Sequence, residues 1–249
     1  MTDNSTLLDE IETQRQAVGS LAWIRNAQSA AAFDSVISYE AFEHLTGENE
    51  QLVPLVAREL AALEYLDESN AWTEAGAYAR HLAQGDNARA VAVTFRSGDD
   101  TGALFAGFDE EFALVAASGE GVADGTFGLS MVPLQALPNF LAKWMPLNPE
   151  WAFANTDFPL TNEQIAGLVV GEITELPEAA GPQLGAMAPE RWTRYVLRFG
   201  DTEPRVLIAV ENWGYFLAEP TDGADNVTLR AFPSSMVYDL LIFGVLSQL

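Results

Sequence analysis

The side chains in this sequence that are able to do chemistry are mainly carboxylates, and they gather on short polar segments. Asp109, Glu110 and Glu111 follow one another directly, and Glu120 and Asp124 come a few residues later. Turn-forming residues around them predict hairpin tips, where side chains are normally solvated. Acids in such places either contact a basic partner or simply form turns. We take these five as candidate partner-binding residues.

Paired carboxylates also have a catalytic use. Residues 97–125 contain seven acids and no base, so we expect one end of a sheet to be strongly negative. Glycoside hydrolysis needs two carboxylates that flank a cleft, one of them with a pKa raised by burial. A carboxylate-dependent hydrolase that uses Asp109 and Glu211 is therefore an alternative function, although solvated turns argue against it.

Other catalytic chemistry has little support in the sequence. The chain has two histidines, His44 and His81, and no cysteine, which leaves no zinc motif, thiolate nucleophile or disulfide. The glycines at 119, 121 and 125 have neither the spacing nor the charge of a phosphate-binding loop. We therefore expect no enzyme activity, no catalytic residue, no metal and no cofactor.

The net charge limits the possible partners. The chain has 36 acids and 12 bases, a net charge of -24. Such a field repels nucleic acid and anionic membranes, so a positive or neutral protein partner is the better expectation, unless the acidity serves only solubility. Asn212 and Trp213 stand at a predicted turn; the tryptophan either contacts a partner or packs across a seam within the fold.

No targeting or membrane signal stands out. The first residues lack a basic region followed by an apolar core, which predicts a cytoplasmic protein. The apolar segment 233–249 is too short and too interrupted to span a bilayer, so we expect a buried helix there.

The elements that must position these residues change in type along the chain. An apolar stripe, Leu7, Ile11, Val18, Leu21 and Ile24, predicts a helix over 6–32, either a docking arm or a helix packed on the body. A short strand at 36–37 precedes helices at 39–46, 52–66 and 73–82. Alternating or apolar runs then predict strands at 90–95, 103–108, 112–117 and 127–131, and a helix opened by Pro133.

The second part of the chain repeats this plan. Thr161 to Gln164 has capping-box spacing and predicts a helix, and residues 176–189 predict a loop. Strands are then expected at 195–199, 206–210, 214–218 and 227–231. Pro233 opens the last helix. The segment FDEEFALVA at 108–116 aligns with VENWGYFLA at 210–218, and LSMVP at 129–133 aligns with LRAFP at 229–233. Residues 36–38 and 159–161 align as the strands that open the two copies.

This alignment predicts an α+β fold made of two antiparallel sheet-plus-helix units related by a pseudo-twofold axis. The predicted organisation is a helical extension at 1–33, a first unit at 34–150, and a second at 151–249 packed with the first as one globular domain. Asp109 and Glu211 take one turn position in the two copies. The acidic loops belong to the first copy and the turn tryptophan to the second, an asymmetry that favours one partner per chain.

The layout resembles the EspG-type chaperones of type VII secretion systems. Residues 36–42 (VISYEAF) look like the opening strand and helix of that family, 57–68 like its helix that ends in an acidic turn, and 72–75 (WTEA) like the start of the next helix. The resemblance extends from Asp34 to the C-terminus. It implies a cytosolic chaperone that binds the exposed apolar tip of a secreted helical-hairpin protein of the PE–PPE class through its sheet and adjoining loops. The chain itself is expected to be a monomer or a homodimer. An interaction module with no role in export is a further alternative.

Overall fold

The ten strands found in the described part of the chain belong to a single antiparallel sheet. The computed structural model describes residues 33–84, 89–119, 122–147, 157–176, 181–221 and 225–249, and the helix predicted at 6–32 lies outside them. The strands are β1 (Ser35–Ser38), β2 (Ala90–Ser97), β3 (Asp100–Phe108), β4 (Phe112–Ala117), β5 (Thr126–Pro133), β6 (Phe158–Thr161), β7 (Trp192–Phe199), β8 (Arg205–Val210), β9 (Gly214–Pro220) and β10 (Asn226–Ala231). The helices are α2 (Tyr39–Thr46), α3 (Pro54–Ala62), α4 (Glu74–Gln84), the 3-10 turn η2 (Leu134–Ala136), α5 (Leu137–Trp144), α6 (Asn162–Val170), α7 (Pro182–Met187) and α8 (Ser234–Leu246).

The strand order places two equivalent five-stranded halves edge to edge. It runs β1-β5-β4-β3-β2-β7-β8-β9-β10-β6, so each strand of the first half has a counterpart at the same distance from the β2–β7 seam. The seam register is symmetric about the pair Val93–Leu197, with Val91 opposite Phe199 and Phe95 opposite Tyr195. This confirms the predicted α+β class and its pseudo-twofold arrangement.

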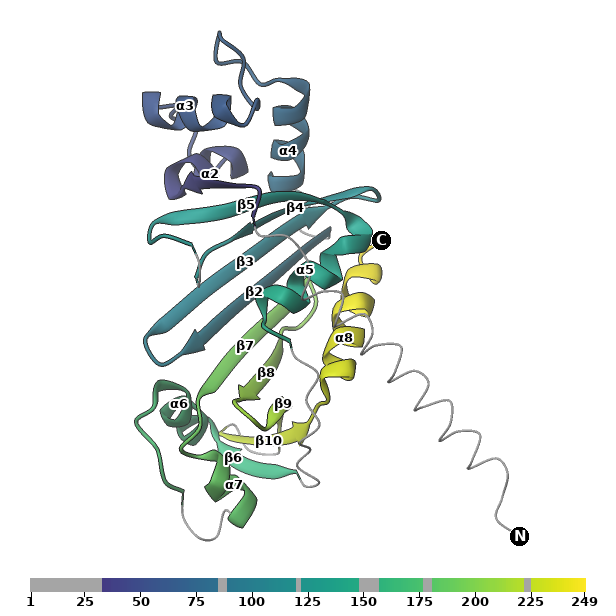
Figure 1. The fold of residues 1–249 in the computed structure, drawn as a ribbon. Coiled ribbons are helices and arrows are strands. Elements are labelled where there is room, and N and C mark those ends of the chain that lie inside the picture. The colour runs from purple at the N-terminus through teal and green to yellow at the C-terminus, as the bar shows by residue number, and fades with distance from the viewer. Residues whose placement is uncertain (1–32, 85–88, 120–121, 148–156, 177–180, 222–224) are drawn as a thin grey trace, which may run out of the picture.

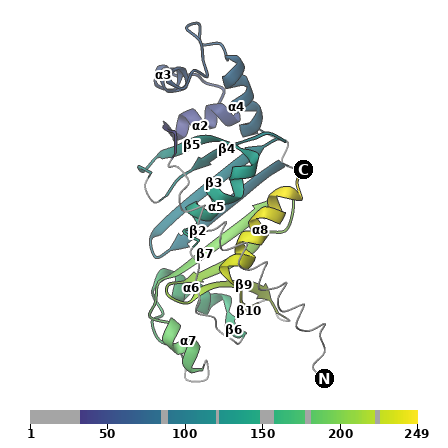
Figure 2. The same cartoon turned by 45° about the vertical axis from the view of Figure 1, so that its right-hand side comes forward.

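Helices cover the two faces of the sheet in different places. On one face α5 and α8 lie side by side over the middle strands, whereas α2–α4 and α6–α7 lie at the two ends (Figures 1 and 2). Strand β4 shows that these groups are on opposite faces, because Ala113 and Val115 belong to the α5–α8 core while Leu114 and Ala116 belong to the α2–α4 core. In the second half, Ile208 and Phe216 join the α6–α7 core.

The helices that follow the two prolines share their buried positions, as the sequence alignment predicted. Leu137 and Leu141 of α5, and Val237 and Leu241 of α8, are all fully buried in the same core. None of the helices within the described ranges has the length and apolarity needed to cross a membrane.

Local capping signals explain where several helices begin. The Ser38 hydroxyl accepts a hydrogen bond from the Ala41 amide, and Thr161 forms a capping box with Gln164, as predicted. Helix α2 ends at Gly47, which has a φ of 83° in the left-handed region that glycine tolerates best.

Three elements differ from the sequence-based expectation. The helix predicted over 52–66 spans only Pro54–Ala62, because Glu64 turns into the left-handed region and its carbonyl accepts a hydrogen bond from Thr73 Oγ1. The loop predicted over 176–189 contains the short helix α7, which buries Leu184 and Met187. Helix α8, expected to be buried, leaves Phe243 68 % exposed.

The sequence alignment of the two halves is also wrong by one residue for strands β3 and β8. Phe108 lies opposite Ala113 in the β3–β4 hairpin, whereas Val210 lies opposite Gly214 in the β8–β9 hairpin. The turn of the first half is therefore one residue longer, and the counterpart of Phe108 is Ala209. For this reason Phe108 faces the α5–α8 core while Val210 faces the α6–α7 core.

Candidate functional site

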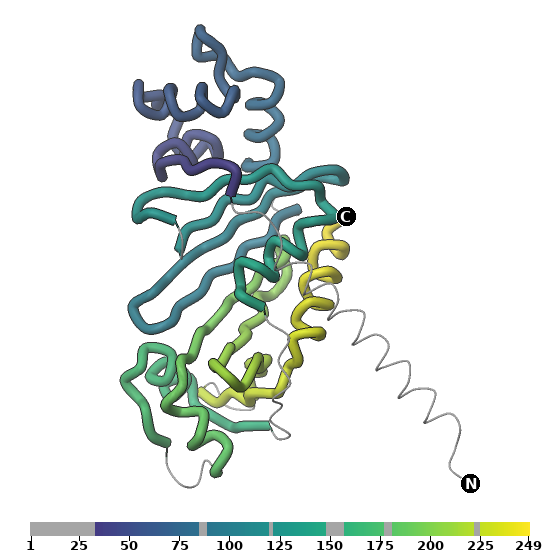
Figure 3. The backbone as a smooth tube through the Cα atoms, viewed as in Figure 1, coloured from purple at the N-terminus to yellow at the C-terminus, as the bar shows by residue number. Residues whose placement is uncertain are grey.

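The acidic segments that were predicted to form one negative surface lie at the two opposite ends of strand β3. Strand β3 runs from Asp100 to Phe108, so the β2–β3 turn and the β3–β4 turn stand about 25 Å apart (Figure 3). Asp124 lines a cavity of about 570 Å³ beside the β2–β3 turn, together with Asp99, Asp100 and Arg191. Asp109, Glu110 and Glu111 form the other turn, and Glu120 lies outside the described residues. The expectation of a single acidic end was therefore wrong.

Asp109 has an architectural role in its turn. Its carboxylate accepts hydrogen bonds from Tyr78 Oη at 2.6 Å and from the amides of Phe112 and Glu111. Burial acts to raise the pKa of Asp109, but these hydrogen bonds outweigh burial and keep the pKa below its usual value. Burial and the bond to Asp109 raise the pKa of Tyr78 to about 12. Glu110, by contrast, is exposed, and within the described residues its ion pair is with Arg89 at 3.8 Å.

The geometry does not support the hydrolase alternative. Asp109 lies at the end of the sheet near Ala90, whereas Glu211 lies at the end near Trp192, and its amide donates to the Arg191 carbonyl. The length of β7 separates these two ends, which is far more than the 5–10 Å between the carboxylates of glycosidases. A general acid also needs a raised pKa, and that of Asp109 is lowered.

Asn212 and Trp213 form the β8–β9 turn of the second half. Asn212 is exposed, has a φ of 64°, and its Nδ2 donates to Glu190 Oε2 at 3.3 Å. Trp213 is half-buried against the α6–α7 core of its own half, so it does not pack across the seam. Among the described residues, no three His, Asp or Glu side chains come close enough together to hold a metal ion.

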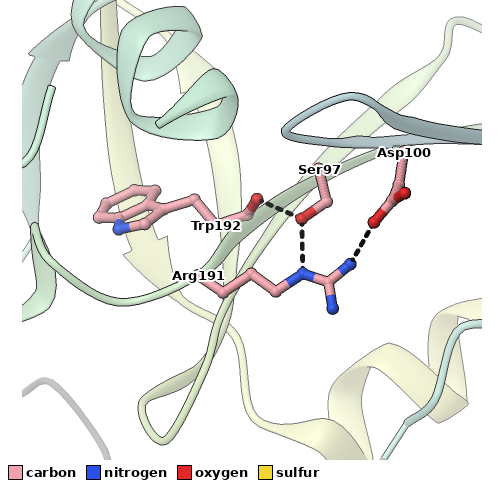
Figure 4. Close-up of polar contacts among 4 residues, drawn as sticks. All are labelled: Ser97, Asp100, Arg191 and Trp192. Carbon is pink, nitrogen blue, oxygen red and sulfur yellow. Dashed lines mark hydrogen bonds and ion pairs between the residues drawn. The ribbon is translucent and has the colours of Figure 1, made fainter. Parts of the chain in front are cut away.

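A polar clamp joins the two halves at one end of the seam. Ser97 Oγ donates to the Trp192 carbonyl at 3.0 Å and accepts from Arg191 Nε at 2.9 Å, and Arg191 Nη2 donates to Asp100 at 3.0 Å (Figure 4). The Gly98 amide adds a 2.7 Å hydrogen bond to the carbonyl of Val169 in α6. Ser97 is buried, and a hydrogen bond made away from water is costly to break. The clamp therefore fixes the register of β2 against β7.

That register creates a charged surface on the middle of the sheet. Val93 and Leu197 point into the α5–α8 core, so their neighbours Thr94, Arg96, Arg194, Val196 and Arg198 point to the opposite face. Helix α6 contacts both β2 and β7, yet Thr94 and the three arginines are exposed and Val196 is half-buried. We call these five residues the arginine face.

The charges on the arginine face are not neutralised within the described part of the chain. Arg96 lies directly opposite Arg194 across the seam, and Arg198 lies opposite Ala92. All three arginines are exposed, and none forms an ion pair with another described residue. Like charges directly opposite on neighbouring strands destabilise a sheet. The opposed arginines therefore lower the stability of the fold. Their presence in a chain that has 36 acids calls for a functional explanation.

Sequence reasoning missed this surface, although part of its signal was visible. Arg194 and Arg198 alternate with Tyr195, Leu197 and Phe199, which is the pattern of a strand with one charged and one buried face. The position of Arg96 opposite Arg194 depends on the β2–β7 register, and that register joins residues about 100 positions apart.

Comparisons with known proteins identify the fold. No sequence-family profile matches the chain, and no curated protein matches it. In structure, however, the chain shares its fold with a chaperone of a type VII secretion system. That protein is EspG5 of Mycobacterium tuberculosis, solved in complex with a PE25–PPE41 dimer. The similarity has a TM-score of 0.51 at 9 % sequence identity and covers 86 % of this chain and 96 % of the EspG5 chain. The resemblance noted in the sequence is thus matched at the level of the fold.

Proposed function

We propose that this protein is a cytoplasmic secretion chaperone, which binds one helical-hairpin protein of the PE–PPE class and keeps it soluble before export. Its fold is similar to that of EspG5, whose structure contains a PE25–PPE41 dimer. Fold alone does not determine function, so the proposal depends on a surface suited to a protein partner.

The observation that carries the proposal is the arginine face. It is a solvent-exposed part of the sheet on strands that α6 also contacts, and it combines three exposed arginines with the half-buried Val196. Arginine is enriched at protein interfaces because its planar guanidinium binds carboxylates in a bidentate manner and also packs on apolar groups. The partner that complements this surface is a helical protein whose exposed tip carries acidic residues beside apolar ones.

The electrostatics also favour an acidic partner on this surface. The remainder of the chain is strongly negative, so a basic partner would meet attraction almost everywhere and gain little selectivity. An acidic partner is repelled by most of the surface and attracted at the arginine face, which restricts it to one orientation. Because the halves differ in their helices, we propose one partner molecule for each chain.

The test is co-expression with the secreted helical-hairpin proteins encoded near its gene. We expect one of them to be soluble only in the presence of this protein and to co-purify as a one-to-one complex by light scattering. The double variant Arg96→Glu/Arg194→Glu should weaken binding on the order of 30- to 100-fold, since facing like charges cost several kcal/mol and each 1.4 kcal/mol is tenfold.

Arg205→Glu is the matched control. Arg205 is exposed on β8 beside Leu197, on the α5–α8 side of the sheet, so the same change in charge should leave affinity nearly unchanged. Binding that survives the double variant would contradict the assignment of the surface. If no neighbouring secreted protein is bound or solubilised, or if two partners bind each chain, the proposed function itself is wrong.

The turn residues predicted from the sequence remain a second, untested surface. Glu110→Lys/Glu111→Lys and Asn212→Ala/Trp213→Ala examine the two turns separately. If the arginine face is the docking surface, these variants should bind the partner with unchanged affinity. Loss of binding in the turn variants alone would move the site to the turns.

A further inference from the structure

Helix α8 carries a stripe of apolar side chains that are open to water. Met236 is 48 % exposed, Phe243 68 % and Leu246 55 %. These residues share the outward side of the helix, because they recur at intervals of seven and three. A helix that is apolar on nearly all sides normally has its outer side covered as well. The stripe is therefore a candidate contact surface.

The stripe continues into a groove beside the helix. A cavity of about 560 Å³ opens between α8, η2 and the β3–β4 turn, and its apolar lining comes mainly from Phe112, Leu134, Pro138, Ile242 and Leu246. Leu246 belongs to both the stripe and the lining, so the two form one continuous surface. We call this surface, from Met236 to the cavity, the α8 groove. Contiguous apolar surfaces of this kind mark sites that bind another molecule.

Acidic side chains border this apolar surface. Glu110 and Glu111 line the cavity, and none of the described residues that line it is basic. Both are exposed; Glu110 lies 3.8 Å from Arg89, whereas Glu111 forms no ion pair with another described residue. On the stripe itself, Asp239 stands three residues after Met236 and is the only charged residue of α8. A ligand that complements the α8 groove therefore has an apolar side with basic groups beside it.

The walls of the groove favour a helix as that ligand. The backbone of α8 is hydrogen-bonded within the helix, and the turn pairs its own backbone, with the Asp109 amide on the Phe112 carbonyl and the Leu134 amide on the Glu111 carbonyl. An extended peptide would find few backbone partners here, so binding has to come from side chains. An amphipathic helix presents apolar side chains at i, i+3, i+4 and i+7. The stripe from Met236 to Leu246 is about 15 Å long, which matches about three turns of such a helix.

A second copy of this chain fits the charges of the α8 groove poorly. In a twofold dimer the same patch meets itself, so the carboxylates of the two copies would be brought together. The net charge of -24 on each chain adds a long-range repulsion. The same charges attract a basic ligand.

We propose that the α8 groove binds an amphipathic helix of another protein, apolar along one side and flanked there by lysine or arginine residues. This partner differs from the acidic partner of the arginine face. The two surfaces lie on opposite faces of the sheet, so one chain can hold both partners at once. The inference goes beyond the proposed function and does not depend on it.

Binding of designed peptides to the full chain tests the proposal. The probe is a labelled peptide of about 18 residues, about 27 Å long as a helix, with leucines at helical spacing and lysines elsewhere. Fluorescence anisotropy at about 0.15 M salt should show saturable one-to-one binding. A peptide of the same composition with its leucines scrambled keeps the charge but loses the apolar side, and should bind at least about tenfold more weakly. A peptide with glutamates in place of the lysines should bind more weakly by at least the same factor.

Variants of the chain locate the bound peptide. Phe243→Ala/Leu246→Ala should weaken binding of the lysine peptide about 10- to 30-fold, because both side chains lose apolar area that the peptide covers. Glu110→Gln/Glu111→Gln should weaken it about three- to tenfold, and this loss should shrink as salt is added. Both variants change exposed side chains, so their circular dichroism should match that of the natural chain.

Val36→Ala/Leu55→Ala is the matched control. These apolar side chains are 59 % and 51 % exposed on β1 and α3, away from α8, and their loss should change the affinity by less than about twofold. Equal binding of the three peptides, or unchanged affinity in Phe243→Ala/Leu246→Ala, would overturn the proposal. A dimer of the natural chain in light scattering that this variant dissociates would overturn it too, because the groove would then belong to a second copy. The acidic partner is a separate probe, so any of these results leaves the proposed function standing.

Discussion

The opposed arginines at the seam give a prediction with an unusual sign, namely that removal of one charge stabilises the protein. Arg194 lies directly opposite Arg96, and opposing Cβ atoms in an antiparallel pair are about 5 Å apart. Two guanidinium charges about 6 Å apart in water repel by about 0.7 kcal/mol, and 0.1 M salt reduces this to about half. Arg194→Gln should therefore raise the free energy of unfolding by about 0.3–0.7 kcal/mol.

The measurement is urea unfolding at low and high salt, followed by circular dichroism. A gain of this size corresponds to about 1–2 °C in Tm for a chain of this length, and it should shrink as salt is added. Arg198→Gln is the matched control, because Arg198 faces Ala92 and not another arginine. In a chain of net charge -24 the control should lose a little stability, since it removes a positive charge without relieving a repulsion.

A double-mutant cycle isolates the interaction between the two arginines. Arg96→Gln and Arg194→Gln should be less than additive, because either one alone removes the same repulsion. The reasoning is refuted if the coupling is zero at low salt, or if Arg194→Gln and Arg198→Gln change stability equally. In either case the opposed pair would carry no cost, and its persistence would no longer indicate a binding role.

Three further predictions concern the body of the fold. Leu141→Ala should lower the free energy of unfolding by about 2–5 kcal/mol in urea, because the side chain is fully buried between α5 and α8, whereas Leu55→Ala at an exposed position of α3 should change it by less than about 0.5 kcal/mol. Thr161→Ala should cost about 1 kcal/mol through loss of the α6 capping box, and Thr161→Ser should restore most of it; equal loss in both would contradict the cap. Tyr78→Phe should lower the free energy of unfolding most at neutral pH. The pKa of Asp109 is lowered on folding, so the stability that Asp109 contributes is present above its unfolded pKa and is lost as pH falls. The pKa of Tyr78 is raised to about 12, so the stability that Tyr78 contributes falls as pH rises from about 10. A stability difference independent of pH would argue against the pair.

The sequence predicted well those features that depend on neighbours along the chain. The bounds of β4, the cap at Ser38 and the capping box at Thr161 all depend on residues within a few positions of one another, and all were found as expected. The short helix α7 was missed because its glycine- and proline-rich surroundings resemble a loop. Its helical state depends on burying Leu184 and Met187 against the sheet.

Features that depend on pairing between distant segments were less accessible. The one-residue difference between the two central hairpins cannot be seen in an ungapped alignment, because Phe108 and Val210 are both apolar and only their partner strands reveal which face each one occupies. The arginine face had to be missed for the same reason. The acidic turns were conspicuous in sequence, yet strand direction separates them, and strand direction is a property of the whole sheet.

The two edges of the sheet have a consequence for how a partner can be recognised. Strands β1 and β6 are only four residues long, each leads directly into a capped helix, and β6 contains Pro159, which has no amide hydrogen to donate. Short edges interrupted by proline offer few free amides to an incoming strand. Recognition by β-augmentation, in which a peptide extends the sheet, is thereby disfavoured. The same edges also resist end-to-end pairing of sheets, which lowers the tendency of this sheet to template aggregation.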